Sequence, residues 1–189
     1  LLIAIDQEGG MVKRLKVETG FPATASAGDL GNHDDPILTA IHAGCTAQTL
    51  SLLGINYNLA PVVDLNIYPN NPVIGKIKRS FSDDPDTVIR HATIWIQEHK
   101  SRNILSCLKH FPGHGSSRTD SHLGFTDIST SWQEIELLPF IKLIGRTNQT
   151  QVDSVMLGHL FHSGLDNTYP TSLSYSVIQN LLRTQLGFK

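Results

Sequence analysis

The chain has little of several features that mark particular protein classes. It holds two cysteines and 17% charged residues, where roughly 25% is usual, and its apolar runs fall short of the roughly 18 residues of a membrane-spanning helix. Its 15 Lys+Arg and 17 Asp+Glu nearly cancel, to a formal net charge of -2, whereas polyanion binding needs clustered cations. We therefore expect no nucleic-acid partner and no membrane span. With 189 residues, 40% of them hydrophobic, one folded domain is expected.

The first residues and the cysteines add two expectations. The opening segment LLIAIDQEGG lacks an initiator Met, a basic region and a cleavage site, so it is not a signal peptide and resembles a chain entered within its fold. Cys45 and Cys107 lie in apolar surroundings, which favours two reduced core thiols over a disulfide.

Short apolar segments alternate with longer amphipathic ones, a pattern typical of strand–helix units. The predicted strands span 1–5, 57–64, 104–109 and 153–158. The predicted helices span 36–53, 85–100, a segment starting at 131, and 175–186. A long polar loop is expected between the first strand and the first helix. The helix at 85–100 has an apolar face formed by Val88, Ile89, Ala92, Trp95 and Ile96.

The ends of these helices carry recognisable signals. Ser131 and Glu134 have the spacing of a capping box, in which each side chain satisfies a backbone N–H of the other residue. For the helix at 36–53, the predicted N-cap is Asp34 or Asp35 before Pro36, and Gly54 ends the helix. For the helix at 85–100, the predicted N-cap is Ser82 or Asp83 before Pro85. For the helix at 175–186, Ser174 is the predicted N-cap and Gly187 ends the helix.

Four such units imply parallel strands joined by helical crossovers, in either a doubly wound sheet or a barrel. A (β/α)8 barrel takes about 250 residues and eight units. We therefore expect an α/β fold, a partial TIM-like barrel of about four βα units that forms one incomplete domain over 1–189. Both architectures place their chemistry at the carboxyl ends of strands, where this sequence has Asp6 to Gly10, Asp64, Lys109 with His110, and His159.

The segment KHFPGHGSSRTDSH, 109–122, concentrates the polar residues most suited to chemistry. His110 and His114 stand four apart, as two metal ligands on a helix would. Pro112 and the flanking glycines forbid a regular helix there, and the Glu that would act as base is missing. The pattern therefore argues against a metal site.

Asp120 and His122 offer a different chemistry. A carboxylate that accepts from one ring nitrogen fixes the tautomer and raises the basicity of the other, giving an acid/base group near neutral pH. Alone, the pair could equally be a turn cap and an exposed histidine. The nearby Lys109 and His110 favour the acid/base interpretation.

The glycines after Asp6, the residue Arg79 and the histidines at 159 and 162 each allow a functional and a structural interpretation. The glycines after Asp6 either bring backbone close to a ligand or form a tight turn, with Arg14 a few residues on. Arg79 either clamps a ligand oxygen or pairs with Asp83 or Asp84. His159 and His162 are more typical of satisfied loop histidines than of ligands.

Together these motifs resemble the N-terminal barrel domain of glycoside hydrolase family 3, in its bacterial β-N-acetylglucosaminidase branch. The resemblance covers essentially the whole chain and is carried, in the family's order, by DQEGG with Arg14, LGINYNLAPVVDL, RSFSDDP, KHFPGHG followed by DSH, and LRTQLGF. KHFPGHG with DSH is highly specific for this branch.

The resemblance implies removal of terminal β-linked N-acetylglucosamine with retention of configuration, through a covalent glycosyl-enzyme intermediate. It implies cell-wall muropeptide fragments as substrates in peptidoglycan recycling, a cytoplasmic location and no cofactor. It also assigns His122 as the general acid/base and Asp120 as the residue that orients it. The residues assigned to the sugar hydroxyls are Asp6, Arg14, Arg79, Lys109 and His110.

The sequence departs from the family pattern in ways that matter. The family nucleophile is an aspartate in a Ser-Asp-Asp type motif on the strand after LGF, beyond Lys189, so we expect residues 1–189 alone to be inactive. Met11 replaces a usual Arg and Gly158 a common Ala. The alternatives are a β-glucosidase or β-xylosidase of the same family, a non-catalytic sugar-binding relic, and a metal-dependent hydrolase using His110, His114 and His122.

Overall fold

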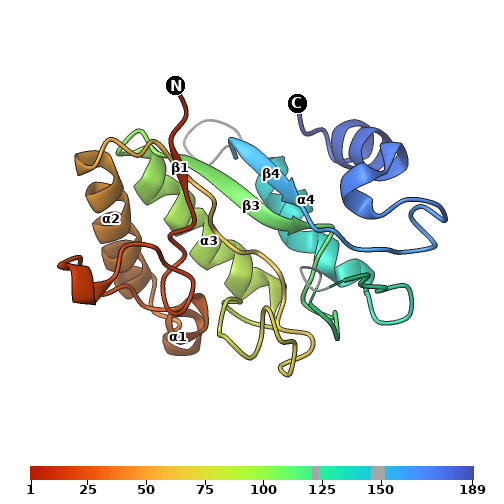
Figure 1. Ribbon diagram of the computed structural model, residues 1–189, viewed down its shortest axis with the longest axis horizontal. Helices are drawn as coiled ribbons and strands as arrows, with labels where there is room; N and C mark the ends of the chain where they lie inside the picture. Colours follow the sequence, from red (N-terminus) through yellow and green to blue (C-terminus); the bar gives the residue numbers. More distant parts are fainter. Residues whose placement is uncertain (121–123, 146–151) are drawn as a thin grey trace.

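The computed structural model describes residues 1–120, 124–145 and 152–189, and within them four parallel strands form one sheet (Figure 1). The strands are β1 (Ala4–Ile5), β2 (Tyr57–Asn58), β3 (Leu105–Phe111) and β4 (Ser154–Leu157). Each strand pairs with the next one along the chain, in the order β1-β2-β3-β4, as successive units of a (β/α)8 barrel do. The predicted α/β fold, a partial TIM-like barrel, is confirmed.

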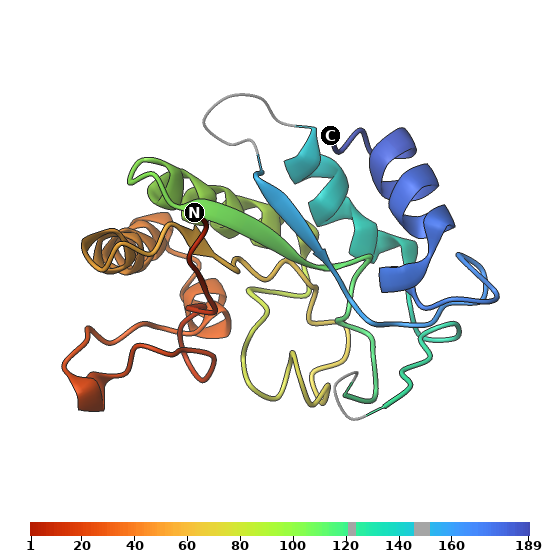
Figure 2. The ribbon, with the colours of Figure 1, turned by 45° about the horizontal axis from the view of Figure 1, so that its top comes forward.

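Three helices lie along one face of this sheet (Figures 1 and 2). They are α2 (Pro36–Leu52), α3 (Pro85–Lys100) and α4 (Leu138–Ile144), with α3 packed against both of the others. Shorter helical elements are η1 (Val17–Thr19), α1 (Ala27–His33), η2 (Glu134–Leu137), η4 (Thr171–Leu173) and the π-type helix η5 (Ser176–Gln185). The two elements η1 and α1 correct the expectation of an uninterrupted polar loop. Helix α1 forms because the Ser26 side chain accepts a hydrogen bond from the Asp29 N–H.

The first two strands are shorter than predicted. Pairing of the first strand with β2 is confined to the last two residues of the predicted strand, and Leu1, Leu2 and Ile3 are exposed. In the second unit the ladder stops after Asn58, and Pro61 lacks an N–H with which to continue it. The chain nevertheless stays beside β3, because the Val63 N–H donates to the Lys109 carbonyl at 2.9 Å.

The main core lies between the sheet and its helices. The predicted apolar face of α3 is buried there, with Val88, Ala92 and Ile96 fully inaccessible to solvent. Strand β3 is buried along most of its length, as a strand covered on both faces should be. Strand β4 is only partly buried throughout.

The capping box at Ser131 and Glu134 is wrong. Helix η2 begins at Glu134, and the side chain of Glu136 accepts from the Gln133 N–H at 3.2 Å. The indole of Trp132 donates to the Pro112 carbonyl at 3.2 Å, which fixes the preceding residues in a turn and moves the helix start.

The other helix ends follow the sequence more closely. Asp35 caps α2 and Gly54 follows it with a φ of 74°. Asp84 caps α3, in place of Ser82 or Asp83, because it stands directly before Pro85 and accepts from two N–H groups of the first turn. The Ser174 hydroxyl accepts from the Val177 N–H and Gly187 has a φ of 76°, as predicted.

Both cysteines are free thiols, Cys107 buried and Cys45 partly so. In the part of the chain that the structure describes, none of the helices combines the length and the apolar character that spanning a membrane requires.

Candidate active site

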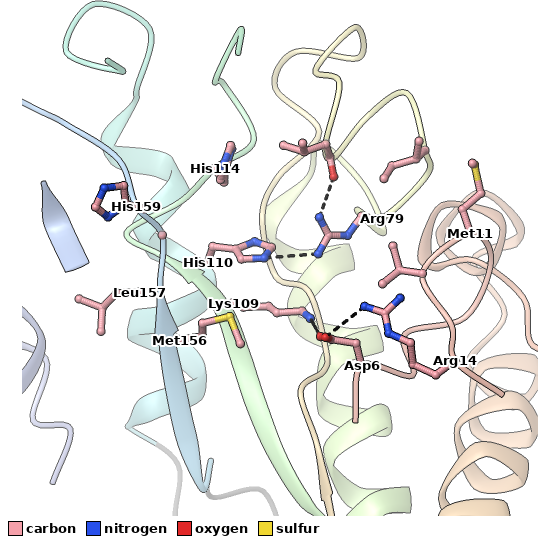
Figure 3. A pocket seen from close by; sticks show the side chains of 14 residues that line it. Asp6, Met11, Arg14, Arg79, Lys109, His110, His114, Met156, Leu157 and His159 are labelled. Atoms are coloured by element: carbon pink, nitrogen blue, oxygen red, sulfur yellow. Dashed lines mark hydrogen bonds and ion pairs between the residues drawn. The ribbon is translucent and has the colours of Figure 1, made fainter. Parts of the chain in front are cut away.

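A cavity of about 490 Å³ opens at the carboxyl ends of the strands (Figure 3). Asp6 follows β1, Lys109 and His110 belong to the end of β3, and Gly158 follows β4. Arg14 comes from the loop after β1 and Arg79 from the loop before α3. The five residues that the resemblance assigns to sugar hydroxyls all line this cavity: Asp6, Arg14, Arg79, Lys109 and His110.

Two cations that line the cavity, Arg79 and Lys109, share a carboxylate behind them that the sequence analysis did not assign to the site. Glu8, 8% exposed, accepts two hydrogen bonds of 2.8 Å from the Arg79 guanidinium, and its Oε1 lies 2.5 Å from Lys109 Nζ. Arg79 therefore pairs with Glu8, not with Asp83 or Asp84. Burial alone would raise the pKa of Glu8, but the two cations outweigh it and hold that pKa below its usual value.

Lys109 links Glu8 to Asp6. Its side chain is buried, and Nζ also lies 2.9 Å from Asp6 Oδ1. Asp6 Oδ2 faces Arg14 across 3.5 Å, a looser and more exposed contact. Burial would raise the pKa of Asp6, and the ammonium of Lys109 overcomes this, so the pKa is lowered. Asp6 is thus an ionised acceptor at the edge of the cavity.

His110 is oriented by a second carboxylate that the site assignment lacked. Asp64, fully buried, accepts from His110 Nδ1 at 2.6 Å through one oxygen. Its other oxygen accepts from the backbone N–H groups of His110 and His114. Burial raises the pKa of Asp64, but His110 more than compensates, so the carboxyl is ionised at neutral pH. With Nδ1 donating, His110 Nε2 is the acceptor, and it faces an Arg79 nitrogen at 3.3 Å.

The glycines after Asp6 form a tight turn. The Gly9 N–H donates to the Val12 carbonyl and the Val12 N–H returns to Gly9. Gly9 has a φ of 98°, and a Cβ there would lie 2.1 Å from the carbonyl oxygen of Ala25. The lack of a side chain at Gly9 therefore permits close packing within the chain, as the tight-turn interpretation predicts.

The alternative of a metal site at His110 and His114 finds no third ligand among the described residues. The rings of His110 and His114 are in edge contact, with centroids 5.7 Å apart. Over residues 1–120, 124–145 and 152–189, no three His, Cys, Asp or Glu side chains converge as a metal site.

The model of the glycosyl hydrolase family 3 N terminal domain matches residues 1–189. The chain belongs to glycosyl hydrolase family 3.

Relatives in this family agree in sequence and in structure. Beta-hexosaminidase A of Pseudoalteromonas piscicida is 36% identical over 205 residues, which cover 100% of this chain and 33% of that protein. A family 3 beta-N-acetylglucosaminidase from Paenibacillus sp. str. FPU-7 superposes with a TM-score of 0.90 at 37% identity, covering 100% of this chain and 35% of that one. NagZ from Neisseria gonorrhoeae, solved with N-trifluoroacetyl-D-glucosamine, superposes with a TM-score of 0.88 at 32% identity. The match covers 100% of this chain and 56% of that one. The chain spans between 33% and 55% of the length of the first curated relatives it matches.

Met11 and Gly158, which the resemblance marks as departures, both lie at the cavity. Met11 lines the rim and is 74% exposed, on the opposite side from His159 (Figure 3). Gly158 also lines the cavity, and a Cβ there would come within 2.9 Å of the Leu160 side chain. His159 lines the cavity while its Nδ1 contacts the Ser172 hydroxyl at 2.7 Å.

The predicted acid/base pair of the family stays a prediction. Asp120 is described, but His122 falls in 121–123, outside the described residues. The stems on either side of this segment are joined, because the Thr119 hydroxyl donates to Thr126 Oγ1 at 3.0 Å. The Thr126 carbonyl in turn accepts from the Phe161 N–H, so Thr126 lies beside the chain that follows β4.

Sequence reasoning placed Glu8 and Asp64 at the ends of strands but did not assign either carboxylate a role. Glu8 stands two residues after Asp6 within DQEGG, and Asp64 closes the second predicted strand, so both lay at the expected edge. Their partners lie 71 and 46 positions away, Arg79 for Glu8 and His110 for Asp64. Position marked them as candidates, but only the fold shows which side chain each one pairs with.

Proposed function

We propose that the native polypeptide containing this chain removes terminal β-linked N-acetylglucosamine from glycans, cell-wall muropeptides among them. The observation that carries the proposal is the convergence of five side chains, already paired and ordered, on one cavity at the strand ends. The ligand of the Neisseria structure, an N-acylated glucosamine, supports a sugar of this class.

The chemistry of the five side chains suits a hydroxylated ring. Lys109 Nζ and the Arg79 guanidinium offer fixed N–H donors, and the carboxylate of Asp6 accepts from sugar hydroxyls. His110 Nδ1 donates to Asp64 and its Nε2 faces an Arg79 nitrogen at 3.3 Å, so the ring helps to hold the guanidinium at the cavity. Charge-assisted hydrogen bonds of this kind strengthen when a ring hydroxyl becomes more polarised as the sugar flattens toward the transition state.

The proposed mechanism is two-step retention. His122, oriented by Asp120, would protonate the departing oxygen as imidazolium and then, as neutral imidazole, activate water against the glycosyl-enzyme intermediate. Such a mechanism needs a carboxylate nucleophile on the opposite face of the anomeric carbon. We assign no residue of 1–189 to that role and expect this segment alone to show no turnover.

Hydrolysis of aryl β-N-acetylglucosaminide and aryl β-glucoside by the native polypeptide tests the proposal. We expect the N-acetylated substrate to be strongly preferred and the activity to fall on His122→Ala. Preference for the glucoside would make the protein another family 3 glycosidase. Binding of N-acetylglucosamine without turnover of either substrate would indicate a sugar-binding relic.

Chelator treatment separates the metal alternative. We expect full activity after dialysis against a chelator, because the proposed acid/base chemistry requires no bound metal. Loss of activity that zinc restores would contradict the proposal. The β-anomeric product, followed by NMR in the first minutes, would support retention over inversion.

A further inference from the structure

A chain of buried hydrogen bonds connects α3 with the loop that carries Asp6 and Arg14. We infer that His99, Asn58 and Gln7 act together as positioning residues that hold this loop in place for sugar binding. The inference rests on the proposed glycosidase function and deepens it, because none of the three lines the cavity.

His99 forms the first link. It lies in the last turn of α3, fully buried and stacked on Trp95, with ring centroids 5.0 Å apart. Its Nδ1 lies 2.9 Å from the Trp95 carbonyl oxygen, which can only accept, so Nδ1 carries the proton. Nε2 is then a bare acceptor, 3.0 Å from the Nδ2 of Asn58. Burial lowers the pKa of His99 to about 4, which keeps the ring neutral near pH 7.

Asn58, on β2, forms the second link. Its Oδ1 accepts from the Gln7 N–H at 3.1 Å, and its Nδ2 donates to the Gln7 carbonyl at 3.0 Å. A single side chain thus satisfies both backbone polar groups of Gln7. The second amide proton of Asn58 goes to His99 Nε2. Without that acceptor the amide would keep a buried, unpaired N–H.

Gln7 completes the chain at the cavity loop. Its Oε1 accepts from the backbone N–H groups of Arg14 and Leu15, at 2.9 and 3.0 Å, and its Nε2 donates to the Leu15 carbonyl. Gln7 stands between Asp6 and Glu8 and is 3% exposed. Any displacement of Gln7 therefore moves two site carboxylates and the backbone of Arg14 together.

Helix α3 also supplies a matched control. His91 is fully buried like His99 and stacks on Phe81, with centroids 5.4 Å apart. Both of its ring nitrogens are bonded as well, Nδ1 to the Thr39 hydroxyl at 2.7 Å and Nε2 to Asp34 at 3.0 Å. Thr39 lies in α2 and Asp34 is the C-cap of α1, so neither partner belongs to the loop of 6–15. Replacing either histidine removes two hydrogen bonds of a buried ring, although the bond from His91 to Asp34 is only partly buried, and only His99 connects to the loop of 6–15.

The experiment compares His99→Phe with His91→Phe in the native polypeptide. Hydrogen exchange of the peptide spanning 6–15 reports the loop, and kcat/KM for aryl β-N-acetylglucosaminide reports the site. For His99→Phe we expect about tenfold faster exchange at the Arg14 and Leu15 amides and a 10- to 100-fold loss of kcat/KM, since displacement by about 1 Å can cost 100-fold. His91→Phe should lower thermal stability but change neither readout.

A rescue variant and a second route sharpen the comparison. His99→Gln keeps an oxygen that can accept from Asn58 and should recover most of the activity and the protection. If His99→Phe does not fold, Gln7→Met removes the last link instead and should expose the same two amides.

Equal exchange in the two phenylalanine variants would overturn the inference. So would faster exchange in His99→Phe with an unchanged kcat/KM. A wild-type polypeptide without hydrolytic activity would instead refute the proposed function, and the exchange comparison would then decide by itself whether His99 holds the loop.

Discussion

Replacing Glu8 by Gln removes the charge that two buried cations share while keeping the size of the side chain. Glu8 is 6% exposed at its side chain, Arg79 11% and Lys109 2%. The amide retains one acceptor oxygen, but its NH2 group faces a guanidinium or ammonium donor. We therefore expect the free energy of unfolding to fall and the cavity to lose its ordered donors.

The expected loss of unfolding free energy depends on which contacts of Arg79 and Lys109 remain in Glu8→Gln. Removing one partner of a buried pair costs about 3–5 kcal/mol, because a charge is left uncompensated. Asp6 still lies 2.9 Å from Lys109 Nζ, so mainly Arg79 is left without its carboxylate. We expect about 3 kcal/mol, at the lower end of that range.

Equilibrium urea unfolding at pH 7, followed by the fluorescence of Trp95 and Trp132, measures the effect. With an m value of about 2 kcal/mol/M, Glu8→Gln should lower the midpoint by about 1.5 M. The control is Asp29→Asn, whose partner Lys78 lies 2.8 Å away in an ion pair with side chains 46% and 61% exposed. That variant should cost less than about 1 kcal/mol. Equal midpoints for the two variants would refute the reasoning.

Three further predictions follow from single groups. His99 has its pKa lowered to about 4 by burial, so as pH falls from about 6.5 to 4 the unfolded chain takes up a proton that the native state does not. The free energy of unfolding should drop by about 3 kcal/mol over this pH range because of this group. Urea unfolding of His99→Gln across the same pH range should lack that part of the decrease. Asp64→Asn removes the carboxylate that orients His110; kcat/KM on the aryl N-acetylglucosaminide should fall about 100-fold, and an unchanged value would contradict the assigned role. Gly115→Ala would place a Cβ 1.6 Å from a backbone carbonyl oxygen and should cost about 3 kcal/mol or more in urea unfolding. Gly145→Ala, with its nearest contact at 3.5 Å, should stay within about 0.5 kcal/mol, and similar losses in both would argue against the clash.

The parts of the fold that depend on local pattern could be predicted from the sequence. The run of β3 and the apolar face of α3 are set by which residues avoid water, and Asp35 with Gly54 delimits α2 through backbone hydrogen bonding within a few residues. The carboxyl ends of the strands, and therefore the edge that carries the cavity, follow from the same pattern.

What the sequence could not settle depends on contacts between distant segments. Ser131 with Glu134 and Gln133 with Glu136 both fit the spacing of a capping box, and the contact of Trp132 with a loop twenty positions away decides between them. The pairing of Glu8 with the cavity cations is of the same kind. Local spacing names the candidate groups, and tertiary packing selects among them.

The shared carboxylate of Glu8 also affects how a ligand would be bound. Lysine and arginine side chains each carry about 2 kcal/mol of rotamer entropy when free. In this cavity Lys109 and Arg79 are held by contacts with Glu8 that the chain itself supplies. The free-energy cost of ordering them is part of folding, so a sugar ring that enters the cavity meets stationary donors and loses little affinity to side-chain rearrangement.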